Sequence, residues 1–145
     1  MTNAVFGLWV ATAFLGVYMF TFTTTTVAVG ATARGPGDDP TAGAELPSKL
    51  PPLTLFVHPL FGLAGLSTWI AYAASDERAL AWTTLAILGT GALIGDVLTV
   101  KTIGSRRDSE LNAEDRIPTA AIATHGLLAL ATLTLVLLVA LGVGD

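Results

Sequence analysis

The sequence contains no cysteine, and this absence removes several kinds of site at once. Without cysteine the chain cannot form disulfides, thiolate metal sites or iron–sulfur clusters, and it cannot attach haem covalently as c-type cytochromes do. Any metal or cofactor must therefore be held by other side chains. Histidine is the best remaining ligand, and only two histidines occur among the 145 residues.

Charged residues are also scarce. They make up 12% of the chain, whereas 52% of residues are hydrophobic and the mean hydropathy is +0.69. The net charge of −4 comes with no basic patch, so we expect no nucleic-acid partner. Several apolar runs reach the roughly 20 residues needed to span about 30 Å of hydrocarbon. The sequence predicts a single domain, residues 1–145, embedded in a lipid bilayer.

Four apolar segments predict four transmembrane helices. Each segment is continuously apolar rather than alternating, and in a bilayer only helices or closed barrels satisfy the backbone hydrogen bonds. The predicted fold class is therefore an all-α integral membrane protein, a bundle of four transmembrane helices. The predicted helices cover about 3–30, 53–74, 80–100 and 119–143.

The two histidines occupy matching places in two copies of one pattern. Pro51 is followed after six residues by His58, and Pro118 is followed after six residues by His125. Both copies reduce to P-x6-H-x-L-x-x-L-A-x-L. The repeat predicts two duplicated helical hairpins related by a pseudo-two-fold axis along the membrane normal. The second and fourth helices then run in the same direction, and both imidazoles lie about 9 Å below the same face.

Other polar residues fall near the depth of the histidines. Asp96 lies close to the end of the third predicted helix, and Thr24 belongs to a threonine run that ends the first. Ionisable groups within a membrane span are costly, and they usually face the bundle interior or a cavity. Asp96 either assists the imidazoles or reaches the interface to pair with Lys101 or Arg107. Threonines in membrane helices commonly bond to their own backbone, so a structural role for the run stays open.

Imidazole is a good ligand for haem iron and for zinc, copper and non-haem iron. Apolar surroundings favour a haem, and two axial imidazoles saturate its iron, which suits electron transfer. We therefore expect at most one haem b per chain, with His58 and His125 as axial ligands. The residues expected beside the haem propionates are Arg106, Arg107 and Thr24. The alternative cofactor is a single transition-metal ion held by the two histidines and Asp96, which could otherwise orient one imidazole.

His58 and His125, on parallel helices with small residues around them, resemble the axial ligands of four-helix membrane cytochromes b of the cytochrome b561 type. The resemblance covers the layout of all four helices. It implies a b-type haem protein that exchanges electrons with quinone or with a redox partner subunit. Those families generally carry four axial histidines and two haems, so this chain would be a single-haem variant. The overall pattern also resembles small membrane proteins of actinobacteria.

Three classes of function stay open at this point. The first is a haem protein for electron transfer or a subunit of a redox complex, and the second is a metal-binding or transport protein. The third is a non-catalytic accessory subunit of a larger complex, in which the histidines only form hydrogen bonds between helices. Homo- and hetero-oligomers are compatible with each. A stand-alone enzyme fits less well, because no Ser–His–Asp arrangement falls at one depth.

Lysine and arginine counts predict the orientation of a membrane protein. Six of the seven lie on the side of the two long loops, and only Arg78 lies on the side of the termini. We therefore expect a bacterial plasma-membrane protein with both termini outside and the long loops in the cytoplasm. Trp9, Trp69, Trp82 and Tyr72 fall near the termini side, where they predict an interfacial aromatic belt.

Overall fold

The computed structural model describes residues 1–32, 48, 50–107 and 112–143, without the side chains of 24–32. The elements are α1 (Thr2–Thr32), α2 (Pro52–Ser75), α3 (Arg78–Ser105), the 3-10 helix η1 (Ala113–Arg116) and α4 (Thr119–Ala140). No strand occurs in these described ranges. All four long helices are long and apolar enough to cross a membrane. The predicted all-α, four-helix membrane fold is confirmed.

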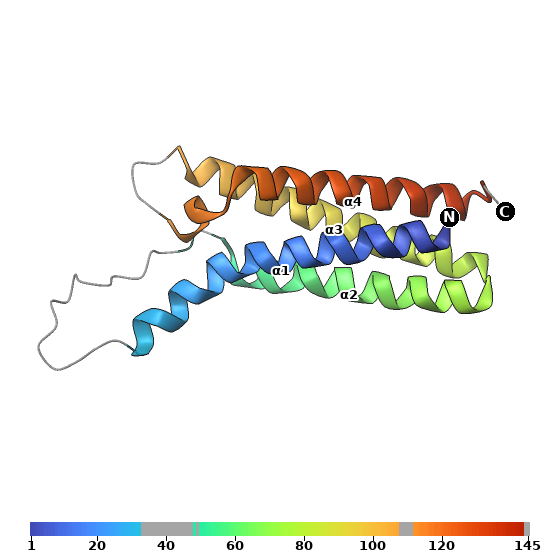
Figure 1. Cartoon of the computed structure of the whole chain (residues 1–145), viewed down its shortest axis with the longest axis horizontal. Coiled ribbons are helices and arrows are strands. Elements are labelled where there is room, and N and C mark those ends of the chain that lie inside the picture. Colours follow the sequence, from blue (N-terminus) through green and yellow to red (C-terminus); the bar gives the residue numbers. More distant parts are fainter. Residues whose placement is uncertain (33–47, 49, 108–111, 144–145) are drawn as a thin grey trace, which may run out of the picture.

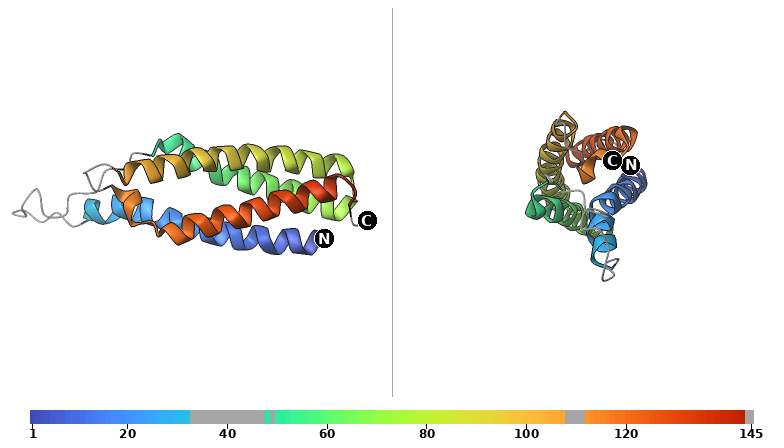
Figure 2. Two further views of the ribbon diagram at one scale, coloured as in Figure 1. Left: turned by 90° about the horizontal axis from the view of Figure 1, so that it is seen from above. Right: turned by 90° about the vertical axis from the view of Figure 1, so that its left-hand side faces the viewer.

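The helices lie side by side in one bundle, with the two termini at one end and η1 at the other (Figure 1). We call these ends the termini side and the loop side. The main pairings are α2 with α3 and α1 with α4, and α3 also packs on α4. Viewed along the bundle, α1 and α3 therefore occupy one diagonal, and α2 and α4 occupy the other (Figure 2). The two helices that carry the histidines face each other across the bundle axis.

Both histidine helices begin directly after the proline of the repeated pattern. Pro51 caps α2 with φ −62° and ψ 123°, and Pro118 caps α4 with φ −60° and ψ 130°. The Pro51 carbonyl accepts the first helical bond from the N–H of Leu55, and the Pro118 carbonyl accepts that of Ala121. Proline tolerates such positions because its missing N–H would have no partner there. The repeat in the sequence is thus a repeat in backbone structure.

Two helix ends differ from the predicted ones by three or more residues. Helix α3 continues to Ser105, five residues past the predicted end, because the helix runs on into polar residues such as Lys101 and Thr102 beyond the apolar span. Helix α4 ends at Ala140, earlier than predicted, because Gly142 adopts φ +76°. The Gly142 N–H donates to the Val139 carbonyl and the Val143 N–H donates to the Leu138 carbonyl, each at 2.9 Å. These two bonds form a Schellman motif, in which glycine is the favoured residue.

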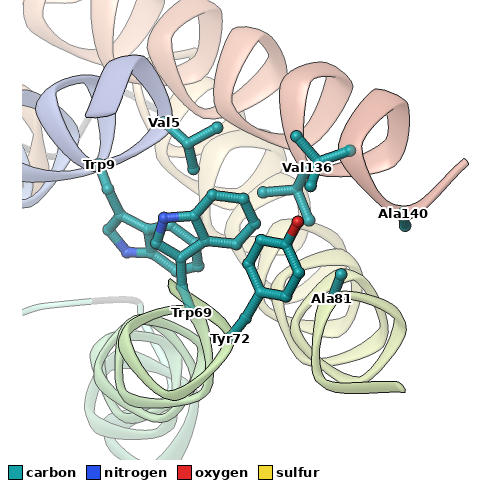
Figure 3. Packing of buried hydrophobic residues seen from close by; sticks show 8 residues of the cluster. Val5, Trp9, Trp69, Tyr72, Ala81, Val136 and Ala140 are labelled. Atoms are coloured by element: carbon teal, nitrogen blue, oxygen red, sulfur yellow. The ribbon is translucent and has the colours of Figure 1, made fainter. Parts of the chain in front are cut away.

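The hydrophobic core lies in the termini half of the bundle and is built around aromatic residues (Figure 3). Trp9 is 4% exposed and Trp69 is 1% exposed, and the Trp69 ring lies 4.9 Å from that of Tyr72. These three residues are buried inside the bundle, so their predicted place in an interfacial aromatic belt is wrong. Trp82, in contrast, is 45% exposed. Position along a helix sets depth in the membrane, but it does not set which face of the helix a side chain occupies.

Candidate histidine-pair site

His58 and His125 meet at the centre of the bundle. Their ring centres are 6.1 Å apart, and the ring planes make an angle of 63°. Both side chains are half-buried, and they project toward each other from α2 and α4. The structure thus brings together two residues that are 67 positions apart, at the depth where the repeat predicts them to lie.

Each imidazole is held by a backbone carbonyl of a different helix. The Nδ1 atom of His58 lies 3.0 Å from the carbonyl oxygen of Gly91, and the Nδ1 atom of His125 lies 3.0 Å from that of Thr12. A carbonyl can only accept, so each Nδ1 carries the proton and donates it. In the neutral form of each ring, the other nitrogen, Nε2, presents a lone pair. Among the described residues it has no hydrogen-bond partner in either ring.

A glycine lies one helical turn beyond each of these carbonyls, and each imidazole rests against it. A Cβ added at Gly95 would lie 2.9 Å from Cε1 of His58, closer than real Cβ contacts allow. A Cβ added at Gly16 would lie 3.2 Å from Cε1 of His125. The two rings therefore occupy space that exists because these positions lack side chains.

The anchors are reciprocal between the two hairpins. His58, in the first hairpin, binds the first helix of the second hairpin, and His125 binds the first helix of the first hairpin. In both cases the acceptor carbonyl and the supporting glycine are four residues apart. This reciprocity is the arrangement expected of two hairpins related by a pseudo-two-fold axis. The sequence did not single out Thr12 and Gly16, because the offset of 67 residues between the two copies of the pattern does not align Gly16 with Gly95.

Asp96 does not join the histidines. Its side chain is exposed, and the described part of the chain contains no group of three histidine, cysteine or acidic side chains able to hold a metal ion. Successive residues of an α-helix point about 100° apart. Because Gly95 faces His58, its neighbour Asp96 is turned away from the site. The expected set of two histidines and one carboxylate is therefore not assembled.

The residues expected beside the haem propionates lie in different surroundings. Arg106 donates from its guanidinium to the Thr119 hydroxyl and to the Ile117 carbonyl, which fastens the end of α3 to the start of α4. Arg107 is exposed at the same end of the bundle. The side chain of Thr24 lies outside the described residues. In the same threonine run, the hydroxyl of Thr23 donates to the Phe20 carbonyl at 2.8 Å, in keeping with the structural reading.

A buried carboxylate on the loop side was not foreseen. Glu114 in η1 is 0% exposed, and its Oε1 accepts from the Ser48 hydroxyl and, at 3.1 Å, from the Leu50 N–H. Its Oε2 is buried and has no hydrogen-bond partner among the residues that the structure describes, and the same holds for Nε of Arg106. Because η1 packs on both α1 and α3, it forms a polar cap over the loop-side end of the bundle. Nothing in the sequence marked this glutamate among the other charged residues of its loop.

No protein-family model, no curated protein and no solved structure gives a significant match to this chain. Function is therefore argued from the geometry of the described residues.

Proposed function

We propose that the histidine pair holds one b-type haem and that the protein transfers single electrons. The observation that carries the proposal is the 6.1 Å between the two ring centres. An imidazole nitrogen lies about 2.0 Å from a metal ion that it binds, and the ring centre lies about 1 Å further away. Two rings on opposite sides of one ion thus have centres about 6 Å apart. The observed spacing supports axial ligation of one iron by both rings.

The surroundings of the rings fit the same role. Metal-binding histidines usually donate their second N–H to a carbonyl or carboxylate, which fixes the tautomer and the ring orientation. The Gly91 and Thr12 carbonyls supply this contact here. The 63° between the ring planes is compatible with shared ligation, because an imidazole can rotate about its bond to the metal. Gly16 and Gly95 supply bare backbone against which the rings rest.

A haem fits this donor set better than a bare ion does. Two neutral imidazoles supply only two ligands and no negative charge, and no third ligand is found beside them in the part of the chain that the structure describes. A bare divalent cation would keep its charge uncompensated in an apolar site, which is costly. A haem brings its remaining nitrogen ligands and their negative charge with it, and its apolar ring suits a bundle interior.

In this function the protein binds, orients and shields the cofactor. His58 and His125 would hold the haem iron, and their hydrogen bonds to carbonyls on α3 and α1 would keep the rings in place. Arg106, Arg107 and Thr24 remain the proposed neighbours of the propionates. Electrons would pass to or from quinone or a redox partner subunit, and the chain could act as one subunit of a homo- or hetero-oligomer.

The first experiment is an absorption spectrum of protein produced with ample haem and purified in mild detergent. We expect a sharp α band of a bis-imidazole b haem on reduction, which the His58→Ala and His125→Ala variants lose. Asp96→Asn is the control and should keep the band, because Asp96 is turned away from the pair. A featureless wild-type spectrum would reject the haem. Metal analysis of that sample would then separate an ion site from a purely structural histidine pair.

A further inference from the structure

The histidine pair lies much closer to one face of the membrane than to the other. His58 is six residues from the start of α2 and 17 from its end, and His125 is six residues from the start of α4 and 15 from its end. At 1.5 Å per residue, the rings lie about 9 Å from the loop-side ends and about 22 to 26 Å from the termini-side ends. The site is therefore strongly asymmetric in depth.

The residues that lie on the two sides of the histidine pair also differ in character. The termini half is filled by the apolar cluster around Trp9, Trp69 and Val136, each at most 4% exposed. On the loop side the bundle is covered by the short element η1, which holds the buried polar Glu114. The thick apolar half separates the pair from one aqueous phase, whereas among the described residues the polar cap of η1 is what lies over the pair on the other side.

We propose, on the basis of the haem assignment above, that of the two partners named there the site uses a redox partner protein rather than quinone, and that it exchanges electrons only across the loop-side face, where this water-soluble one-electron carrier docks over η1. Electron tunnelling weakens exponentially with distance, and the rings lie about 9 Å from the loop-side helix ends but about 22 to 26 Å from the termini-side ends. A carrier on the loop side therefore outcompetes one on the termini side. In each exchange the carrier loses or gains one electron and the bound centre gains or loses one. No bond forms or breaks.

The test uses the absence of native cysteine, which lets one introduced cysteine report orientation. Glu77 is exposed in the connection between α2 and α3, on the termini side. The haem-loaded Glu77→Cys protein is placed in phosphatidylcholine vesicles, and a membrane-impermeant maleimide then labels only molecules whose termini side faces outward. Dithionite, a water-soluble reductant that crosses bilayers poorly, is added outside while the reduced haem band is recorded.

We expect the fast phase of reduction to equal the fraction of molecules that the maleimide leaves unlabelled, with the remainder reduced only after detergent is added. A fast phase that equals the whole signal, or that follows the labelled fraction, would overturn the proposal. So would a membrane-permeant quinol that reduces the haem faster than dithionite does in loop-side-out vesicles, because the carrier would then be lipid-soluble. A sample with no haem band before reconstitution instead rejects the haem assignment itself.

A charge reversal on each face gives a second readout. Arg116 is exposed on η1, and its replacement in Arg116→Glu places a negative charge in the path of the dithionite anion. Charges near a docking surface act mainly on the association rate and are screened by salt. We expect the fast phase of haem reduction to be slower in Arg116→Glu than in the wild type at low ionic strength, and to return to the wild-type rate at high salt. The control Glu77→Lys, on the termini side, should leave the fast phase unchanged; equal effects of both variants would contradict docking over η1.

Discussion

Replacing Gly95 by alanine tests whether the glycines position the histidine pair. The new Cβ would lie 2.9 Å from Cε1 of His58, whereas ordinary contact begins at 3.4 Å, so the ring or the helix must move by at least the difference. Moving the ring pulls Nδ1 from the Gly91 carbonyl, 3.0 Å away, and changes the 6.1 Å spacing of the His58 and His125 rings. Loss of such a supporting contact typically weakens metal binding by about 10- to 100-fold.

The assay is a haem titration of the cofactor-free protein in detergent, followed by the reduced spectrum. We expect Gly95→Ala to bind haem about 10- to 100-fold more weakly than wild type, while circular dichroism shows an unchanged helix content. Gly89→Ala is the matched control on the same helix, because a Cβ at Gly89 has no atom within 4 Å. Alanine also favours a helix by about 1 kcal/mol over glycine, so this control should be at least as stable as wild type.

Equal haem affinity and identical spectra for Gly95→Ala and Gly89→Ala would refute the reasoning. The contact between Gly95 and His58 would then have no part in cofactor binding. If Gly95→Ala instead lowered thermal stability while the wild type bound no haem, the glycine would serve only the packing of the histidines.

Three further substitutions have defined outcomes. Gly16→Ala should weaken haem binding less than Gly95→Ala in the same titration, because its Cβ would lie 3.2 Å from the ring of His125; a larger effect would contradict the distances. Glu114→Ala should destabilise the protein by about 1 to 3 kcal/mol in detergent unfolding, because the Ser48 hydroxyl and the Leu50 N–H lose the buried oxygen to which both donate, and Glu114→Gln, which keeps an oxygen, should cost less. Asp76→Gly should stabilise by about 1 kcal/mol, because Asp76 has φ +53°, and no gain in melting temperature would argue against strain there.

The sequence by itself determined the number of helices, their starts and the common depth of the histidines. These features depend on position along the chain. Apolar length decides whether a segment spans the bilayer, the prolines mark where two helices begin, and a fixed rise per residue converts the spacing from Pro51 to His58 into a depth. The depth of the histidines also predicted that the pair lies closer to the loop side than to the termini side.

Only the tertiary structure decided which way the side chains face. A helix that is apolar all round has no polar stripe to mark its inner face, so its rotation about its own axis is set by the neighbours against which it packs. That rotation turns Trp9 and Trp69 into the core, Asp96 away from the site and Gly95 toward His58. The 6.1 Å between the two imidazoles likewise arises from α2 and α4 meeting across the bundle, where α1 and α3 supply the carbonyls that hold each ring.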